Sequence, residues 1–155
     1  MNELQSFYQL ASDFCKFVQE EIQSEGTLDT LISFLMRLYL PAMTLPQPKL
    51  EEESPQLKQM APVEIRFQAD MPTRYREVFE PFEENPPIYC DLKDDLADIV
   101  RDLQNGIAAY ESGLVGRASF TWRDGSEFHW GNHATDAIRV LHAMRRERTV
   151  QKWRE

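Results

Sequence analysis

The sequence predicts an all-α protein, a four- to five-helix bundle with an N-terminal helical hairpin and a long proline-rich loop. Apolar side chains recur every three or four residues in four stretches, which is the spacing of one face of an α-helix. Five of the nine prolines fall between positions 41 and 62, where they interrupt this spacing. A length of 155 residues with 42% hydrophobic side chains suits a single helical domain, residues 1–155, with its own core.

Residues 2–23 and 28–43 are the predicted N-terminal hairpin. The first stretch carries apolar side chains at helical spacing, and Gly26 is expected to end it. Thr27 is a suitable N-cap for the second stretch, which is apolar on more sides and is therefore expected to lie deeper in the protein. The short connection predicts that the two helices pack antiparallel.

The middle of the chain is expected to be largely irregular. Residues 45–62 combine prolines with an acidic run and predict an exposed loop, interpreted as a linker in preference to a lid because it has no glycine hinge or binding motif. Residues 63–68 alternate like a strand but have no evident partner strand. Residues 73–79 are predicted as a short helix that Pro81 stops.

Residues 91–112 have the clearest helical pattern in the chain. Asp91 is expected at the N-cap, and Asp94 and Asp95 complement the helix dipole in the first turn. Gly113 supplies a stop at the carboxyl end. The segment is long enough to be a full helix of a bundle.

The last predicted helical region covers residues 115–148. It is interpreted as two helices, or as one helix bent at residues 124–125 or at Gly131. A charged tail, residues 149–155, follows it. The region is locally basic, which would suit contact with an acidic partner, although a solvated helix end explains the same charges.

Five aspartates of the predicted helix at residues 91–112 fall within a sector of about 100° when the helix is projected at about 100° per residue. This aspartate stripe consists of Asp91, Asp94, Asp95, Asp98 and Asp102. Like charges one turn apart destabilise a helix by a few tenths of a kcal/mol per pair. A divalent cation, arginines of a neighbouring helix or the helix dipole are the candidates that compensate for this repulsion.

Two histidines and an aspartate share a face of the last helical region. His129 and His133 are four residues apart, and Asp136 follows three residues later. Trp130 stands where the zinc-protease motif requires a glutamate, which excludes a protease of that type. Like the aspartate stripe, this histidine face borders the predicted core.

The aspartate and histidine faces could meet between two neighbouring helices and pool their ligand atoms. A divalent metal is then the candidate cofactor, with zinc, manganese or iron suited to Asp94, Asp98, His129 and His133. The alternative is a polar network in which the histidines donate to carboxylates and the aspartates pair with arginines. The arginines available for that pairing are Arg101, Arg117, Arg123 and Arg139.

Charge and composition exclude several classes of function. A formal charge of −9 repels nucleic acid and anionic membrane surfaces.

Cys15 and Cys90 are expected to be free thiols, because their spacing matches no zinc or redox motif. No leader or membrane span is evident, so a cytoplasmic location is expected. Neither a Gly-x-Ser-x-Gly elbow nor a phosphate-binding glycine loop occurs.

Three blocks of the sequence carry a resemblance to a known family. They are EVFEPF at residues 77–82, DLKDDLADIVRDL at residues 91–103 and HWGNHATDAIR at residues 129–139. With these blocks, residues 79–142 resemble a family of uncharacterised bacterial all-helical domains, a domain of unknown function. The resemblance implies a helical fold and brings no known activity.

Two functions from different classes are compatible with these features. The favoured one is a small regulatory or protein-interaction domain that binds another protein, or a second copy of itself, through an apolar helix face with Trp122 or Trp153 near its rim. The alternative is a metal-dependent hydrolase of a phosphorylated small molecule or nucleotide. Its candidate ligands are Asp94, Asp98, His129 and His133, with Asp95 or Asp91 activating water.

Overall fold

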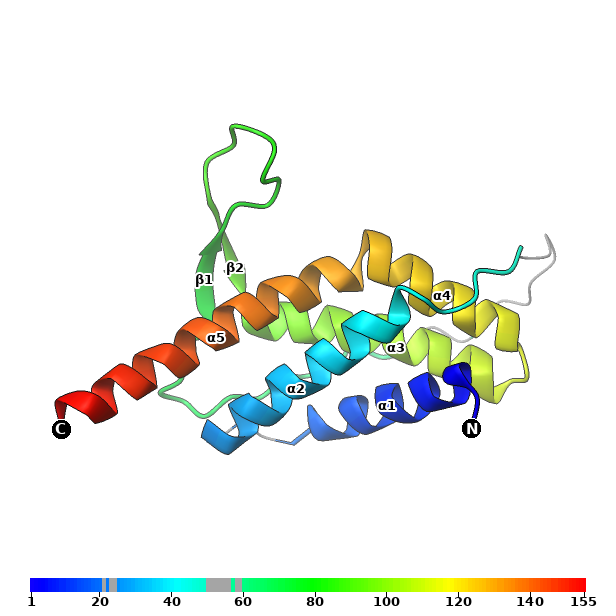
Figure 1. Ribbon diagram of the computed structural model, residues 1–155, viewed down its shortest axis with the longest axis horizontal. Helices are drawn as coiled ribbons and strands as arrows, with labels where there is room; N and C mark the ends of the chain where they lie inside the picture. The colour runs from blue at the N-terminus through cyan, green and yellow to red at the C-terminus, as the bar shows by residue number, and fades with distance from the viewer. Residues whose placement is uncertain (21, 23–24, 50–56, 58–59) are drawn as a thin grey trace.

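The structure is a computed structural model that describes residues 1–155 except 21, 23–24, 50–56 and 58–59. The described chain forms a helical bundle from which one β-hairpin projects (Figure 1), and the predicted all-helical class is confirmed. Its elements are α1 (Glu3–Phe17), α2 (Glu25–Ala42), β1 (Arg74–Glu77), β2 (Ile88–Asp91), α3 (Leu92–Glu111), α4 (Val115–Phe128) and α5 (Trp130–Arg154). Part of the expected loop at residues 45–62 lies outside the described residues. No described helix is long and apolar enough to cross a membrane.

The N-terminal hairpin forms as expected, with α1 and α2 running in opposite directions (Figure 1). Asn2 caps α1 by accepting a hydrogen bond of 2.8 Å from the backbone N–H of Gln5. The start of α2 was predicted wrongly, because Gly26 and Thr27 lie inside the helix and not between two helices. Packing of the apolar face of α2 offsets the cost of about 1 kcal/mol that a glycine has within a helix.

The first helix was also predicted too long. It ends at Phe17, and Ile22 forms an isolated parallel bridge with Phe67. The N–H of Ile22 donates to the carbonyl of Arg66, and the N–H of Gln68 donates to the carbonyl of Ile22, both at 2.9 Å. The strand-like alternation of residues 63–68 therefore has a partner, although only as a single bridge.

A β-hairpin replaces the short helix predicted at residues 73–79. β1 and β2 pair antiparallel, with Arg74 opposite Asp91 and Glu77 opposite Ile88. The N–H of Leu92 donates to the carbonyl of Thr73 at 2.9 Å, so the strand pairing reaches the start of α3. Pairing with β2 overrides the local helical pattern, and Figure 1 shows the hairpin projecting from the bundle beside α3 and α5.

α3 is the central helix and contacts α1, α4 and α5. Asp91 caps it as predicted, accepting a hydrogen bond from the N–H of Lys93 at 2.9 Å. Gly113, with φ of 79°, follows its carboxyl end. A Cβ on Gly106 would lie 2.1 Å from the indole Nε1 of the fully buried Trp122, so α4 packs directly against a glycine of α3.

The region predicted as residues 115–148 divides into two helices at His129, whose φ and ψ are −145° and −86°. This break falls between the two predicted positions. A Cβ on Gly131 would lie 1.8 Å from the carbonyl oxygen of Ser126, so only glycine permits the two helix ends to approach this closely. α5 then continues to Arg154. Most of the charged tail expected at residues 149–155 therefore forms the last turns of this helix.

Two tryptophans and two cysteines bear on the functional expectations. Trp122 is fully buried and therefore lies in the core and not at the rim of a binding surface, whereas Trp153 is exposed.

Both cysteines are free, as predicted. Cys15 is buried in α1, where burial raises its thiol pKa to about 12. Cys90 lies in β2.

Candidate functional site

Carboxylates of α3 face the two histidines at the start of α5. Asp95, Asp98, Asp102, His129 and His133 are the five residues that we call the Asp/His seam. Nδ1 of His133 lies 2.9 Å from Asp95 Oδ1, and its Nε2 lies 3.4 Å from Asp98 Oδ2. Nδ1 of His129 lies 2.5 Å from Asp102 Oδ2. The spacing of one turn on each helix brings these side chains together where α3 and α5 pack.

Asp95 is the buried member of the seam, with 5% of its surface exposed. One carboxylate oxygen accepts from the hydroxyl of Tyr75 at 2.5 Å, and the other lies against the His133 ring. Burial, followed by the hydrogen bond to Asp95, raises the pKa of Tyr75, so the phenol stays protonated and donates. The carboxylate therefore has a partner from β1 and another from α5, which satisfies both oxygens.

Asp98 and Asp102 lie nearer to solvent than Asp95. Oδ1 of Asp98 forms an ion pair of 2.6 Å with Arg101, one turn along α3, while Oδ2 faces His133. Among the arginines expected to pair with aspartates, Arg123 instead donates to the carbonyl of Leu45 at 2.6 Å. Within the part of the chain that the structure describes, the seam pairs aspartates with histidines, and Arg101 of α3 adds an ion pair with Asp98.

The other predicted site residues have different positions. Asp91 caps α3, so its side chain is occupied with the backbone. Asp94 is exposed and is not a member of the seam. Asp136 is half-buried on α5, within electrostatic reach of Glu77, Asp95 and His133.

Three of the four predicted metal ligands lie close together. Asp98, His129 and His133 each offer one ligand atom, and these three atoms lie within 4.8 Å of one another. Asp94, the fourth predicted ligand, is not part of this group. A carboxylate with two imidazoles suits zinc and other divalent transition metals. Metal binding by these residues stays a prediction.

Negative charge gathers around the seam and shifts the protonation of its neighbours. Burial, followed by the charges of Glu77 and Asp95, raises the pKa of Asp136 to about 6. Burial and the charge of Asp95 also raise the pKa of Glu77. The hydrogen bond to Asp95 raises the pKa of His133, although burial opposes this. Asp136 therefore exchanges its proton near neutral pH, which suits a general acid or base.

Sequence reasoning missed the contribution of the hairpin to the site. Tyr75 and Glu77 of β1 and Cys90 of β2 all face the buried Asp95, and the charge of Asp95 contributes to a raised pKa for each. Burial is the largest cause in all three cases. The alternation of Tyr75 and Glu77 with exposed arginines was the available signal, because alternate side chains of a strand point to one face.

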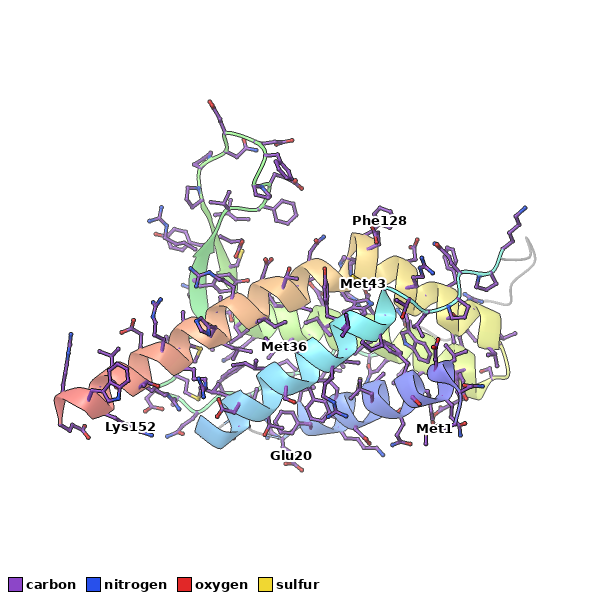
Figure 2. All side chains as sticks on the ribbon, in the orientation of Figure 1. Met1, Glu20, Met36, Met43, Phe128 and Lys152 are labelled. Atoms are coloured by element: carbon purple, nitrogen blue, oxygen red, sulfur yellow. The ribbon has the colours of Figure 1, made fainter. Side chains whose placement is uncertain are left out.

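The loop of residues 78–87, which joins β1 to β2, is the second notable feature of the surface. Together with the start of β2 it exposes five large apolar side chains, namely Val78, Phe79, Phe82, Ile88 and Tyr89. Figure 2 shows the side chains of this hairpin loop extending away from the bundle. They contribute nothing to the core, so their exposure is not explained by folding of the bundle.

Comparison with known proteins places the chain in a family and a fold without an activity. The crystal structure of protein BF1032 from Bacteroides fragilis is similar, with a TM-score of 0.63 over 94% of this chain and 96% of that chain. The two sequences are 20% identical, so this likeness shows the fold alone. Among curated proteins no match was found. The family described as Domain of unknown function (DUF5063) matches residues 1–147, and the chain therefore belongs to it.

Proposed function

We propose that the chain is a protein-interaction domain that docks through its hairpin loop, and that a second copy of the chain is its first partner. The observation that supports this most directly is the exposure of Phe82, which lies in the loop between β1 and β2 and is 99% accessible. Phe79 and Tyr89 flank it at 62% and 81%. Isolated exposed apolar residues are common, but several on one projecting loop are typical of a binding element.

The size of the hairpin loop suits a specific contact. An aromatic side chain buries about 150–250 Å² when it is covered, so three of them account for much of the about 800 Å² that each partner contributes to a standard interface. Glu80, Glu83 and Glu84 lie in the same loop, which contains no basic residue. A fitting receptor therefore combines an apolar floor with basic side chains at its edge.

A groove on the chain itself is the candidate receptor. A groove of about 500 Å³ lies between α5 and the segment before β1, with Val140, Ala143 and Met144 on its apolar side. Arg74 and Arg148 also line it and supply positive charge, while Asp70 and Glu147 are its acidic members. A two-fold arrangement in which each hairpin loop enters the groove of the other copy would use both surfaces in one closed dimer.

Sedimentation velocity over a wide range of concentration tests this proposal. The full chain is expected to self-associate, and Phe82→Ser is expected to abolish association because it removes the anchor of the loop. Arg148→Glu is expected to weaken association by reversing a charge at the groove.

Met36→Ser is the matched control for Phe82→Ser. Met36 is also an exposed apolar residue, but it lies on α2, as Figure 2 shows. The substitution Met36→Ser should therefore leave association unchanged. A monomer at every concentration overturns the proposal, and so does an oligomer that Phe82→Ser leaves intact.

A second candidate, a metal-dependent hydrolase of a phosphorylated small molecule or nucleotide, is favoured by a different observation. A groove of about 360 Å³ is lined by Asp98 and Arg101 together with Ala97, Val63, Pro62 and Met60. Arg101 is a suitable partner for a phosphate group, and Asp98 belongs to the Asp/His seam. Asp136 supplies a proton-exchanging group near His133. Asp95 and Asp91, the bases first considered, are held by other hydrogen bonds.

A panel of phosphate monoesters and nucleotides, assayed with zinc or manganese, tests this second candidate. Hydrolysis should fall strongly in Arg101→Met and Asp136→Asn, because the first removes the cation facing phosphate and the second removes the titrating carboxyl group. Absence of hydrolysis across the panel, or hydrolysis unaffected by both substitutions, excludes this candidate while leaving the docking proposal untouched.

A further inference from the structure

We propose that Asp98, His129 and His133 form a binding site for one divalent transition metal ion, with zinc as the first choice. The three ligand atoms lie within 4.8 Å of one another, and Nε2 of His133 lies 3.4 Å from Asp98 Oδ2. In a tetrahedral site with bonds of about 2 Å, ligand atoms lie about 3.3 Å apart. The pair is therefore already at the spacing that a shared zinc ion requires.

The hydrogen bonds of the two histidines supply the second, independent support. Nδ1 of His133 is paired with the carboxylate of Asp95, and Nδ1 of His129 is paired with that of Asp102. With the proton held on Nδ1, the lone pair of a neutral imidazole is on Nε2. Histidines that bind metals nearly always donate their other ring N–H to a carboxylate, a carbonyl or water, which fixes the tautomer and the ring orientation. Both histidines of the seam show the carboxylate form of this pattern.

The two carboxylate oxygens of Asp98 also have different neighbours. Oδ1 is held by Arg101 at 2.6 Å, and Oδ2 is directed to His133. An ion bound at Oδ2 would leave the contact with Arg101 in place. Each of the three ligands therefore has one atom fixed by a neighbour and one atom available to a metal.

The positions of the ligands are set by rigid backbone. Asp98 is in the second turn of α3, and His133 is one turn into α5. His129 lies at the break between α4 and α5, where the backbones at Gly131 and Ser126 are so close that a Cβ on Gly131 would clash. A site assembled on packed helices loses little freedom when an ion binds, which favours tight binding.

The donor set identifies the class of metal and leaves a place for a further ligand. Two imidazoles and one carboxylate suit zinc, and three protein ligands leave a fourth tetrahedral position for water or an anion. The side chains of His129, Asp98 and His133 are 45%, 29% and 26% exposed, so solvent reaches the site. The site is independent of the docking proposal, since none of its residues belongs to the hairpin loop.

Titration of metal-stripped full-length protein with Zn²⁺ by calorimetry, and with Co²⁺ by visible absorption, tests the proposal. One ion per chain is expected, and Co²⁺ should give the intense bands of a four-coordinate site. His129→Gln and Asp98→Asn should each abolish the Co²⁺ bands and the stoichiometric binding. Asp102→Asn, which removes only the partner of His129 Nδ1, should weaken binding about 10- to 100-fold.

Two variants are matched controls. His142→Gln alters the remaining histidine, which is exposed on α5, and Asp94→Asn alters an exposed aspartate of α3 outside the cluster. Both should bind zinc as the unaltered chain does. A circular dichroism melt of each variant confirms that it is folded. Absence of stoichiometric binding by the unaltered chain overturns the proposal. Equal binding by His129→Gln and Asp98→Asn, or an equal loss in His142→Gln, does so too.

Discussion

The Asp/His seam and the hairpin loop differ in whether their side chains have partners within the chain. In the seam, polar groups lie between packed helices, and Asp95, Asp102 and both histidines have partners within the chain. In the hairpin loop, aromatic side chains lie in solvent, and Phe82 touches almost nothing. The polar groups of the seam pair with one another within the folded chain, whereas the apolar side chains of the hairpin loop are exposed to solvent. Substitutions in the two regions should therefore affect different properties.

The largest effect on stability is expected at Gly131, next to the break between α4 and α5 at which His129 of the seam lies. Gly131→Ala would place a Cβ 1.8 Å from the carbonyl oxygen of Ser126, and backbone cannot move aside as a flexible side chain can. We expect a loss of about 3 kcal/mol or more in the free energy of unfolding, measured by urea denaturation. Gly113→Ala has nothing within 4 Å of the added Cβ and tests the cost of its positive φ alone. If Gly131→Ala lowered the free energy of unfolding less than Gly113→Ala does, the close approach at Gly131 would be contradicted.

Removal of the buried carboxylate should have the next largest effect. Asp95→Ala leaves the hydroxyl of Tyr75 and Nδ1 of His133 without their partner, at an expected cost of about 2–3 kcal/mol in the free energy of unfolding. Asp94→Ala, an exposed aspartate on the same helix, should cost about 0.5 kcal/mol or less. Equal losses in the two variants would show that the seam contributes no more than a solvated helix face.

A smaller, pH-dependent effect is expected at Asp136. Its pKa is about 6 in the folded protein and 3.8 without the fold, so the folded state binds more protons and stability falls as the pH rises between these values. Above this range the charged carboxylate should cost about 1 kcal/mol, after allowance for its partial exposure. Asp136→Asn stays neutral and should therefore be more stable than the unaltered chain above pH 6 but not below pH 3.8. Urea denaturation at the two extremes measures the difference, and a constant difference would contradict the shifted pKa.

The smallest effect on stability should come from the hairpin loop. Phe82→Ser removes a side chain that is 99% exposed, so the free energy of unfolding should change by about 0.5 kcal/mol or less. The same substitution is expected to abolish self-association. A variant that loses stability and association together would place Phe82 in the fold, and the contrast between the two regions would fail.

The two regions also differ in how far the sequence predicts them. α3 was predicted almost to the residue, because Asp91 caps it, Gly113 follows it and its apolar spacing is regular. The meeting of the aspartate and histidine faces followed from the same spacing on two helices. Asp94 could not be separated from Asp95 in this way, because projection gives the face of a helix and not the depth of each side chain.

The hairpin could not be predicted with the same reasoning. Residues 74–77 form a strand only because residues 88–91 lie beside them, and that pairing is a tertiary contact across ten intervening residues. Ile22 likewise leaves the helical pattern because Phe67 offers it a partner. Local periodicity was reliable where a helix closes its own hydrogen bonds and failed where the backbone bonds to distant segments.

The Asp95 carboxylate has a consequence for assembly of the molecule. Its partners lie 20 residues before it, on β1, and 38 residues after it, on α5. An isolated helix or hairpin cannot supply these contacts, so they exist only when three distant segments have come together. The side-chain resonances of Tyr75 and His133 therefore act as markers of complete folding, and they also record whether the hairpin is seated on the bundle.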